Sequence, residues 1–472
     1  MENKMNRRSF LKNSALAGGA LSTVGIGGNA LLSSCSDNTK VKYVPLKAQG
    51  TYYIPELPDF ATDGRELKAG LIGCGGRGKG AVYNLLNAAN GITITAIGDA
   101  FKDRVEDVAA SLEKEKNIVI PADKRFAGLD AYKQVIDSDV DIVLIATPPY
   151  FRPIHFKYAV EKGKHTFLEK PLFVDANGYR SITATAKQAA AKNLAVLTGN
   201  QRHHERKYVE SYQKIMEGYI GEITGGNVYW NGVVPWYKNR QDGWSEGEWM
   251  VRDWVNWKWL SGDHIVEQHV HNIDVFTWFS GLKPVSAVGF GSRARRLTGD
   301  QYDFFSVDFV MENGIHLHSM CRQISGCTDN VSEFIQGTKG SWTTAGGESG
   351  RDCVIKDLAG NEIWKYDFEK EKEQFKQTDP YTLEHVSWIN HIRSGQAINM
   401  VSDFAISNMA GVMGRESAYS GRKVEWSNIV AMEQDFTPEG LSLTKKMDMS
   451  GYTIPLPGRD TSAPGQPRRR QS

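Results

Sequence analysis

One short segment constrains the fold of this chain more than any other: Gly73-Cys74-Gly75-Gly76-Arg77-Gly78. An apolar run from Leu67 to Cys74 precedes it and predicts a strand, and residues 80–89 follow as a predicted helix. Glycines with this spacing at a strand-to-helix turn let the backbone approach a phosphate at the amino terminus of the helix. The next predicted strand, 92–98, ends at Asp99, whose carboxylate is placed to accept hydrogen bonds from ribose hydroxyls. The segment therefore predicts a dinucleotide site.

Predicted strands and helices alternate from this segment to about residue 200. Further strands are expected at 141–146, 165–168 and 194–199, and further helices at 105–114, at 181–192 and in the segment that ends at Gly163. Strands that alternate with helices through short connections form a parallel sheet with helices on both faces. The first part of the chain is therefore predicted to be a Rossmann-type, doubly wound α/β domain.

Beyond residue 200 the alternation stops and short strands follow one another. Strands are predicted at 221–230, 285–291, 304–312, 314–321 and 331–337, and helices at 382–394 and 403–420. Several of these strands alternate apolar and polar residues, as strands with one solvent-facing side do. We therefore predict a second domain of the α+β class, with an open and mostly antiparallel sheet.

The amino-terminal residues have the features of an export signal. Met5-Asn6-Arg7-Arg8-Ser9-Phe10-Leu11-Lys12 contains the paired arginines, the Phe and the Lys of a twin-arginine signal, and a weakly apolar segment extends from Ala15 to Leu32. Leu32-Ser33-Ser34-Cys35 resembles a lipoprotein cleavage box, with Cys35 as the lipid-bearing residue. We expect an exported, periplasmic protein, and a lipid anchor at Cys35 would attach it to a membrane.

These patterns divide the chain into five parts. They are the twin-arginine signal at 1–35, a polar linker at 36–65, the Rossmann domain at 66–200, a substrate-binding and oligomerisation domain at 201–426, and an extension with a basic tail at 427–472. The two folded domains thus account for most of the chain, and the ends are predicted to lie outside them.

Charge and cysteine content exclude two other classes of protein. The chain has 56 Lys and Arg residues against 55 Asp and Glu residues, so it has no field that would attract nucleic acid. Apart from Cys35 it has four cysteines, too few for a disulfide scaffold in so long a chain. Among these, Cys321 and Cys327 are candidates for a disulfide in an oxidising compartment. The expected partner is a small neutral molecule.

The residues of the fingerprint have separate tasks in binding a dinucleotide. Gly73 permits the tight turn, Gly75 lets the backbone approach the pyrophosphate, and Gly78 lets the helix pack closely. Asp99 would repel a 2′-phosphate, which favours NAD over NADP. Two basic residues shortly after Asp99 leave NADP as the alternative.

Further motifs complete the pattern. Thr147-Pro148 and Glu169-Lys170-Pro171 follow predicted strands, at the edge of the sheet where ligands bind. With the fingerprint, the run from Gly163 to Pro171 and the closing segment from Tyr419 to Val424, they resemble the glucose-fructose oxidoreductase, inositol dehydrogenase and rhizopine-catabolism (Gfo/Idh/MocA) family over residues 66–426. The resemblance implies an NAD(P)-dependent oxidoreductase that acts on a hydroxyl of a sugar, glycoside or polyol. It also implies that Thr147, Pro148, Glu169 and Lys170 contact the cofactor and that copies associate through the open sheet.

The catalytic groups are expected from Lys170 and from the second domain. Oxidation of a hydroxyl requires a base for its proton and a cation that stabilises the incipient alkoxide. The resemblance implies that Lys170 is this cation and that Glu169 lies nearer to the cofactor. The family carries an Asp, three residues, a His and, three residues further on, another Asp. His271 and Asp274 match, whereas Glu267 stands where the family usually has Asp. His271 is the predicted general base or acid, with Glu267 as its partner.

A helix over residues 263–274 would place Glu267, His271 and Asp274 on one face, because they are four and three residues apart. His264 would share that face, so a metal site is the alternative interpretation. Buried histidines on such a helix are also often structural. An acid–base role accounts for Glu267 and His271 without a metal ion, and we therefore predict none.

Aromatic residues between 230 and 278 are the expected contact surface for a carbohydrate. Eight of the 12 tryptophans lie there, and indole faces stack on the C–H faces of sugar rings. The family resemblance adds residues just after the last strand of the first domain. The predicted substrate-binding residues are Arg202, His203, Trp244, Arg252 and Asp274.

Two other functions would use the same parts. Transient oxidation, elimination and re-reduction would make an NAD-dependent glycosidase without net redox change, although relatives of that kind carry a tyrosine-containing motif and lack Glu-Lys-Pro. A non-catalytic lipoprotein that binds a sugar or cofactor would need neither Lys170 nor His271. Because the periplasm holds little free dinucleotide, we expect the cofactor to stay bound through turnover.

Overall fold

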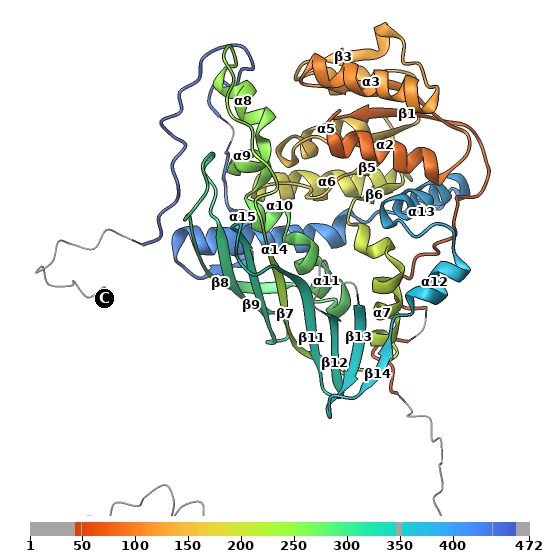
Figure 1. Ribbon diagram of the computed structural model, residues 1–472, viewed down its shortest axis with the longest axis vertical. Helices are drawn as coiled ribbons and strands as arrows, with labels where there is room; N and C mark the ends of the chain where they lie inside the picture. Colours follow the sequence, from red (N-terminus) through yellow and green to blue (C-terminus); the bar gives the residue numbers. More distant parts are fainter. Residues whose placement is uncertain (1–42, 49, 346–351, 437, 459–472) are drawn as a thin grey trace, which may run out of the picture. The chain divides into compact units, whose positions relative to one another are not determined.

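The computed structural model describes residues 43–458, apart from residues 49, 346–351 and 437 (Figure 1). The predicted export signal, with Cys35, and the basic tail lie outside the described residues. Two sheets and their helices make up the described part. Within this part no helix has the length and apolar character that a membrane span requires.

The first sheet is parallel and has six strands in the order β3-β2-β1-β4-β5-β6. Its strands are β1 (Leu67–Ile72), β2 (Ile92–Asp99), β3 (Arg125–Ala127), β4 (Ile142–Ile145), β5 (His165–Leu168) and β6 (Val196–Thr198). Its connecting helices are α2 (Gly76–Ala88), α3 (Lys102–Lys116), α4 (Ala131–Ile136), α5 (Arg152–Glu161) and α6 (Ala176–Ala191). Every residue of β1 except Lys68 is buried, as in a strand covered on both faces. The predicted doubly wound Rossmann domain is confirmed.

The strand order puts the fingerprint at the centre of this sheet. Because β1 lies between β2 and β4, the chain crosses the sheet in one direction after β1 and resumes on its other side at β4. Ligands of open α/β sheets bind outside the carboxyl ends of the strands at such a reversal. Asp99 at the end of β2 and Thr147-Pro148 after β4 line one crevice there.

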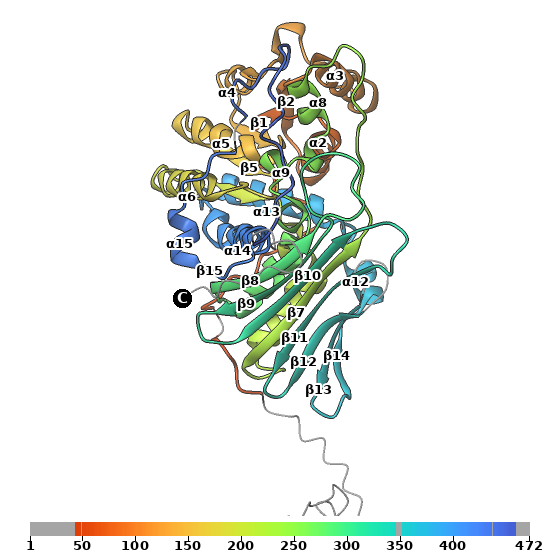
Figure 2. The same cartoon turned by 90° about the vertical axis from the view of Figure 1, so that its left-hand side faces the viewer.

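The second sheet has nine strands in the order β14-β13-β12-β11-β7-β10-β9-β8-β15, and only the β7–β10 pair is parallel among the described strands (Figure 2). The strands are β7 (Ile223–Gly232), β8 (Pro284–Ser292), β9 (Phe304–Met311), β10 (His316–Gln323), β11 (Asn330–Gly337), β12 (Gly340–Ala345), β13 (Asp352–Asp357), β14 (Glu362–Lys365) and β15 (Val424–Glu425). The predicted open, mostly antiparallel sheet is confirmed, whereas β12–β15 were not among the predicted strands.

Nine helices accompany this sheet or link it to the first among the residues described. They are α7 (Arg206–Met216), α8 (Glu246–Arg252), α9 (Lys258–Ser261), α10 (His264–Glu267), α11 (Val270–Ser280), α12 (Phe368–Gln374), α13 (Pro380–Ser394), α14 (Val401–Ser420) and α15 (Trp426–Ala431). Short 3-10 turns are η1 (Ala122–Lys124), η2 (Pro149–Phe151), η3 (Gln201–His204) and η4 (Trp254–Asn256).

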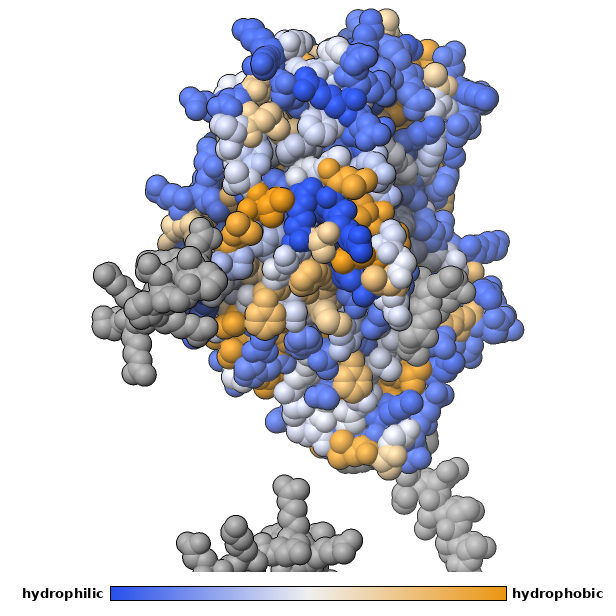
Figure 3. Space-filling view, turned by 60° about the vertical axis from the view of Figure 1, so that its left-hand side comes forward, coloured by the Kyte–Doolittle hydropathy of each residue, from blue (hydrophilic) through white to orange (hydrophobic). Residues whose placement is uncertain are grey.

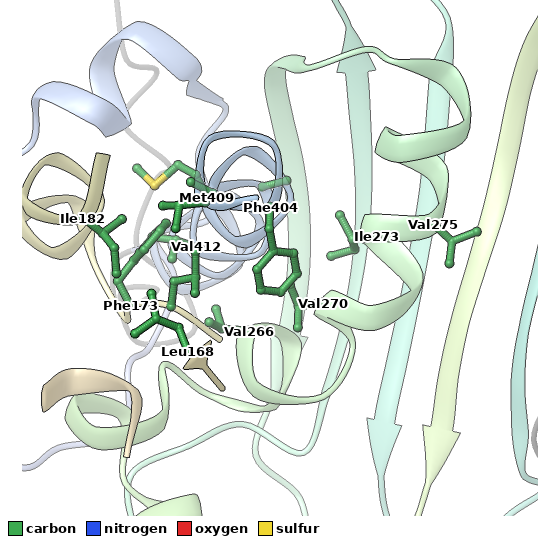
Figure 4. Close-up of a cluster of buried hydrophobic side chains, with 14 of the residues drawn as sticks. Leu168, Phe173, Ile182, Val266, Val270, Ile273, Val275, Phe404, Met409 and Val412 are labelled. Carbon is green, nitrogen blue, oxygen red and sulfur yellow. The ribbon is translucent and has the colours of Figure 1, made fainter. Parts of the chain in front are cut away.

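One continuous apolar core joins the two sheets (Figure 4). Leu168 and Ile182 come from the first domain, Val266 and Val270 from α10 and α11, and Phe404 from α14 (Figure 4). All five are at most 1% exposed. Burial of this kind stabilises by roughly 1.5–3 kcal/mol for each large side chain. The elements that carry the site are therefore fixed relative to one another by shared packing.

Helix α13 packs in the core of the first sheet although it follows the second sheet in sequence. Val386, Trp388 and Ile389 are fully buried there, beside residues of β1, α2 and β6. The Trp388 indole N–H donates to the carbonyl oxygen of Ala195 at 3.3 Å. Helix α13 therefore packs with the first domain, although its position in the sequence falls within residues 201–426 of the second domain.

The described part of the linker, from residue 43, has no regular helix or strand but is fastened along its length. The Leu46 N–H donates to Met216 at 2.8 Å, and the Arg206 guanidinium donates to the Leu57 carbonyl at 2.6 Å. Ala61 is buried in the core of the first sheet. This stretch is thus part of the fold and not a free tether.

Candidate functional site

In the glycine loop after β1, two glycines are required by the packing of the protein itself, and two others border open space. Gly73 has φ +98°, and a Cβ there would lie 2.7 Å from the Ala146 carbonyl carbon. A Cβ on Gly78 would lie 1.8 Å from the Gly73 carbonyl oxygen. By contrast, a Cβ on Gly75 would meet only Arg104, at 3.7 Å, and one on Gly76 nothing within 4 Å. Because α2 begins here without a side-chain cap, its free N–H groups face space that a phosphate group would fill.

Asp99 is fixed to the glycine loop by its carboxylate. One carboxylate oxygen accepts from the Cys74 N–H at 2.7 Å and the other from the Phe101 N–H at 3.0 Å. Burial raises the pKa of Asp99, while the charge of Arg104 acts in the opposite direction. The carboxylate thus lies rigidly at the end of β2, where a nucleotide ribose is expected.

We expect two alanine substitutions in this loop to fail for different reasons. Gly75→Ala should fold normally and weaken NAD binding at least about tenfold, because its Cβ enters the phosphate space. Gly78→Ala should lose about 3 kcal/mol of folding stability, because its Cβ collides with the backbone of β1's turn. Thermal unfolding and NAD titration separate the two effects. A Gly75→Ala variant with unchanged affinity would contradict the phosphate assignment.

Glu169 pairs with the arginine of the fingerprint. The Arg77 Nε lies 2.6 Å from Glu169 Oε1, and the guanidinium of Arg77 lies 4.7 Å from the centre of the Tyr381 ring. Glu384 is fully buried beside this pair, and burial together with the Glu169 charge raises its pKa well above the ordinary value. Glu169, predicted to contact the cofactor, therefore anchors the glycine loop to the Glu-Lys-Pro segment.

Arg152 joins the two other motifs and was not predicted. Its guanidinium donates to the Thr147 carbonyl at 2.8 Å and to the Pro171 carbonyl. The Thr147 hydroxyl also hydrogen-bonds His155 at 3.2 Å. A charged residue directly after a Thr-Pro loop, at the start of a helix, is the signal that could have identified it. Arg152 fixes the loops after β4 and β5 relative to each other.

Lys170 and Glu267 meet across the two domains. The Lys170 ammonium donates to the carbonyl oxygen of Glu267 at 2.7 Å and to its carboxylate Oε1 at 2.9 Å. The carbonyl is available because α10 ends at Glu267. The other carboxylate oxygen, Oε2, is buried and has no hydrogen-bond partner among the described residues. The pair thus fixes the Lys170 ammonium in place and leaves Glu267 Oε2 able to accept a hydrogen bond.

His271 stands in the first turn of α11 and stacks on Trp230, with ring centres 5.6 Å apart. No hydrogen bond holds its ring nitrogens among the described residues. Burial, followed by the charges of Lys170 and Arg202, lowers the pKa of His271 well below 6.5. The imidazole is therefore neutral at pH 7 and able to accept a proton.

Glu267, predicted as the partner of His271, pairs with Lys170, and no hydrogen bond between Glu267 and His271 is found among the described residues. The single helix assumed over residues 263–274 is interrupted after Glu267, and α11 begins only at Val270. Among the residues described, no three His, Cys, Asp or Glu side chains come together as ligands for a metal ion. His264, considered as a metal ligand, hydrogen-bonds Asp263 at 3.1 Å.

Asp274 and His203 are brought together, but not with Lys170. Asp274 accepts from His203 at 2.8 Å, from Asn200 at 3.2 Å and from Ser407 at 2.7 Å. His203 stacks on Trp278, and both line a cavity of about 830 Å³ on the side of α11 that faces α14. Asp274 and His203, both predicted to bind substrate, thus hydrogen-bond each other and lie together at this cavity.

Arg202 forms an ion pair with a buried carboxylate. It pairs with Glu333, which also accepts from Asn272 at 2.6 Å and from Thr344 at 2.8 Å. The Arg202 guanidinium lies 6.0 Å from the centre of the Trp230 ring. Arg202 therefore supports the Trp230–His271 stack, and its charge acts on His271.

We expect Glu333→Gln to lower the free energy of unfolding by about 3 kcal/mol, because Arg202 would keep a buried charge without its counter-ion. Urea denaturation measures the effect. Glu312→Gln is the matched control, since Glu312 pairs with Lys283 on the surface at 4.0 Å and about 0.5 kcal/mol is expected there. Equal losses in the two variants would contradict the assignment.

Arg252, predicted with Trp244 to bind substrate, lies beside the loop that follows β2, and Trp244 packs against its guanidinium. Arg252 donates to both carboxylate oxygens of Asp103, at 2.9 and 3.0 Å, in the first turn of α3. Its guanidinium lies 4.9 Å from the centre of the Trp244 ring. The spacing of residues in the sequence does not indicate this long-range pair.

The cysteines considered for a disulfide, Cys321 and Cys327, are both free.

Comparison with known proteins gives two family matches. Residues 67–197 match the model described as oxidoreductase family, NAD-binding Rossmann fold, and residues 208–343 match the Gfo/Idh/MocA C-terminal domain. Together the two models cover more than half of the 472 residues.

Individual relatives are distant. A protein named glycosyl hydrolase family 109 protein from Shewanella pealeana is 23% identical over 407 residues, 81% of this chain and 82% of that protein. The scyllo-inositol 2-dehydrogenase (NAD(+)) of Bacillus subtilis is 24% identical over 237 residues, 50% of this chain and 60% of that enzyme. For most other curated relatives the chain spans about half of their length. The crystal structure of scyllo-inositol dehydrogenase from Lactobacillus casei with NAD(H) and scyllo-inositol has a TM-score of 0.56 at 19% identity, covering 77% of this chain and 100% of that one.

Proposed function

Since the chain belongs to the Gfo/Idh/MocA oxidoreductase family, we propose that it oxidises a hydroxyl group of a sugar, glycoside or polyol with an NAD that it holds tightly. The observation that carries the proposal is the Lys170–Glu267 pair, which joins the loop after β5 to the second domain, beside a neutral His271. The residues present fit NAD. Gly75 and Gly76 leave space for a phosphate at the start of α2, and Asp99, the last residue of β2, places a carboxylate where the ribose is expected. When bound, NAD supplies the two-electron acceptor.

In this proposal each side chain has one task. Lys170 donates a hydrogen bond to the reacting hydroxyl oxygen and stabilises the charge that grows on it. Glu267 keeps the ammonium in place through its carbonyl and one carboxylate oxygen. His271 takes the hydroxyl proton as a neutral base. Trp230 supports the His271 ring and offers an indole surface for a sugar.

The second candidate is a redox-neutral glycosidase. The long alignment with a glycosyl hydrolase family 109 protein favours it. The Glu169-Lys170-Pro171 motif of this chain favours the dehydrogenase, because the family resemblance implies a different, tyrosine-containing motif in glycosidases of this kind.

A panel of inositols, aldoses and aryl glycosides tests the two activities on the purified holoprotein. Bound reduced nicotinamide and the products are followed together. Reduced cofactor with a ketone product supports the dehydrogenase, and free aglycone without net reduction supports the glycosidase. Turnover of no compound in the panel, with sugars shown to bind, would overturn both in favour of a binding protein.

We also propose export by the twin-arginine route, on the strength of residues 5–12, and lipidation at Cys35. Export of a folded protein explains why the cofactor would stay bound, with a second sugar regenerating it. Arg7→Lys together with Arg8→Lys should retain the precursor in the cytoplasm. Mass spectrometry of the mature amino terminus tests the lipid on Cys35.

We propose that copies associate through the outer face of the second sheet. Phe290 and Met320 lie on either side of Ser306 in neighbouring strands and are 67% and 37% exposed. Hydrophobic residues are scattered over the lower part of this face, where the sheet lies (Figure 3). Light scattering should show an oligomer that Phe290→Lys weakens, and a monomeric wild type would contradict this.

A further inference from the structure

The crevice at the carboxyl ends of β2 and β4 is closed by residues from outside the Rossmann domain. Its inner part, about 40 Å³, is lined by Asp99, Thr147-Pro148 and, from α8, Val251. That volume holds a few water molecules, whereas adenosine is far larger. The outer part, about 630 Å³, lies between Asp103 on α3 and residues 441–444 of the extension. The adenosine end of a dinucleotide is therefore bordered on one side by strand ends and on the other by α8 and the extension.

Helix α8 is attached to the Rossmann domain by Arg252. The bidentate ion pair with Asp103 spans 149 residues of sequence, and the guanidinium of Arg252 also lies 3.8 Å from the centre of the Phe101 ring. Glu248, one turn earlier in α8, accepts from the same guanidinium at 2.8 Å. Two-point contact with a carboxylate fixes the direction of the side chain, so the end of α8 is held over the loop that follows Asp99.

The extension holds α8 from its other side. Glu246 accepts from the Met447 N–H at 3.1 Å, and a Cβ on Gly247 would lie 2.2 Å from the Ser442 carbonyl oxygen. The extension and α8 run beside each other in both ribbon views (Figures 1 and 2). One buried cluster combines the loop after β2, helices α8 and α9 and the extension: Phe101, Met250, Val251, Trp257, Trp259, Leu260 and Met447.

We propose that residues 246–252 and 441–452 form a clasp that closes over the adenosine end of NAD and retains the cofactor through turnover. The inference rests on the proposed function, from which it takes the identity of the cofactor. Release of NAD then requires the Arg252–Asp103 pair to break and the cluster around Met447 to separate from Phe101. Retention thus depends on residues that the Rossmann fingerprint does not contain.

The test measures release of labelled NAD from the full-length holoprotein into an excess of unlabelled NAD. Arg252→Met and Asp103→Asn should each speed release about fivefold, the effect of losing one well-formed ion pair. Because both remove the same contact, the double variant should release NAD no faster than either single variant. Arg125→Met is the control, since Arg125 pairs with Glu106 on α3 at 2.8 Å without touching the clasp.

A chain that ends at Gly440 provides a second and larger perturbation, with an expected acceleration of at least about fiftyfold, because it removes the whole buried surface of the extension. If the truncated chain does not fold, the release rate of the Arg252→Met variant still tests the clasp. Unchanged release in folded Arg252→Met, additive effects in the double variant, or a wild type that loses NAD on dialysis would each overturn the clasp. The measurement needs no substrate, so a protein that retains NAD but oxidises no sugar would refute only the proposed activity.

Discussion

Lys170→Met is expected to lower turnover of the best substrate at least about a thousandfold while NAD stays bound. The variant keeps the length of the side chain but removes the cation that stabilises the alkoxide, and such electrostatic groups commonly contribute factors of this size. It also leaves the Glu267 carboxylate without its partner. Stopped-flow measurement of cofactor reduction gives the rate, and the NAD content of the purified variant gives the binding.

Lys164→Met is the matched control for this variant. Lys164 precedes the same strand and donates to the Val140 carbonyl at 2.7 Å, away from Glu267 and His271. Its rate should stay within about threefold of the native protein, as expected for a surface contact. A Lys170→Met enzyme that retains a tenth or more of native turnover would exclude Lys170 as the stabilising cation.

His271→Asn is expected to lower the rate at least about a hundredfold, the contribution of a general base. In the native protein burial and the charges of Lys170 and Arg202 all lower the pKa of His271. Because a lowered pKa keeps the imidazole neutral in more acidic solution, kcat/KM should stay flat through pH 6.5 and fall only well below it. A profile that already falls near pH 6.5 would contradict this environment.

The same electrostatics predict how Lys170→Met changes the profile. Since the Lys170 charge lowers the pKa of His271, removing it should raise that pKa and move the acid limb to higher pH. NMR titration of labelled histidine observes the shift without turnover. His203→Gln is the comparison, because His203 is bound to Asp274 and its loss should leave the position of the acid limb unchanged.

The parts of the site that sequence could predict are those encoded by local spacing. Gly78 is required by a contact with Gly73 within the same turn, and Gly73 by its positive φ, while Lys170 follows a strand whose place in the sheet is set by alternation. The parallel first sheet and the open, mostly antiparallel arrangement of the second sheet were therefore predictable. The strands β12–β14 were not, because their short segments have no periodicity that distinguishes them from loops.

The errors share a different cause. The helix assumed over residues 263–274 has suitable spacing, but Asp263 takes φ +71° while its carboxylate accepts the Tyr302 N–H at 2.9 Å. This tertiary contact fixes the start of α10 at His264, whereas the break between Glu267 and His271 lies further along, at residues 268–269. Arg252 likewise pairs with Asp103, far away in sequence. Composition suggested a carbohydrate surface there, and only the tertiary structure shows which carboxylate the guanidinium reaches.

The place of α13 in the first core has a consequence for biosynthesis. The Rossmann domain cannot complete its core until residues 386–392, which bury Trp388 and Ile389 against it, have left the ribosome. A nascent chain that ends near residue 200 would expose the apolar side of α2, and expression of that piece alone should give an aggregating product. A complete first core, and with it a fully formed dinucleotide site, is therefore expected only after residues 386–392 have been synthesised. Under the export route proposed above, the chain would receive its cofactor between the end of its synthesis and its translocation.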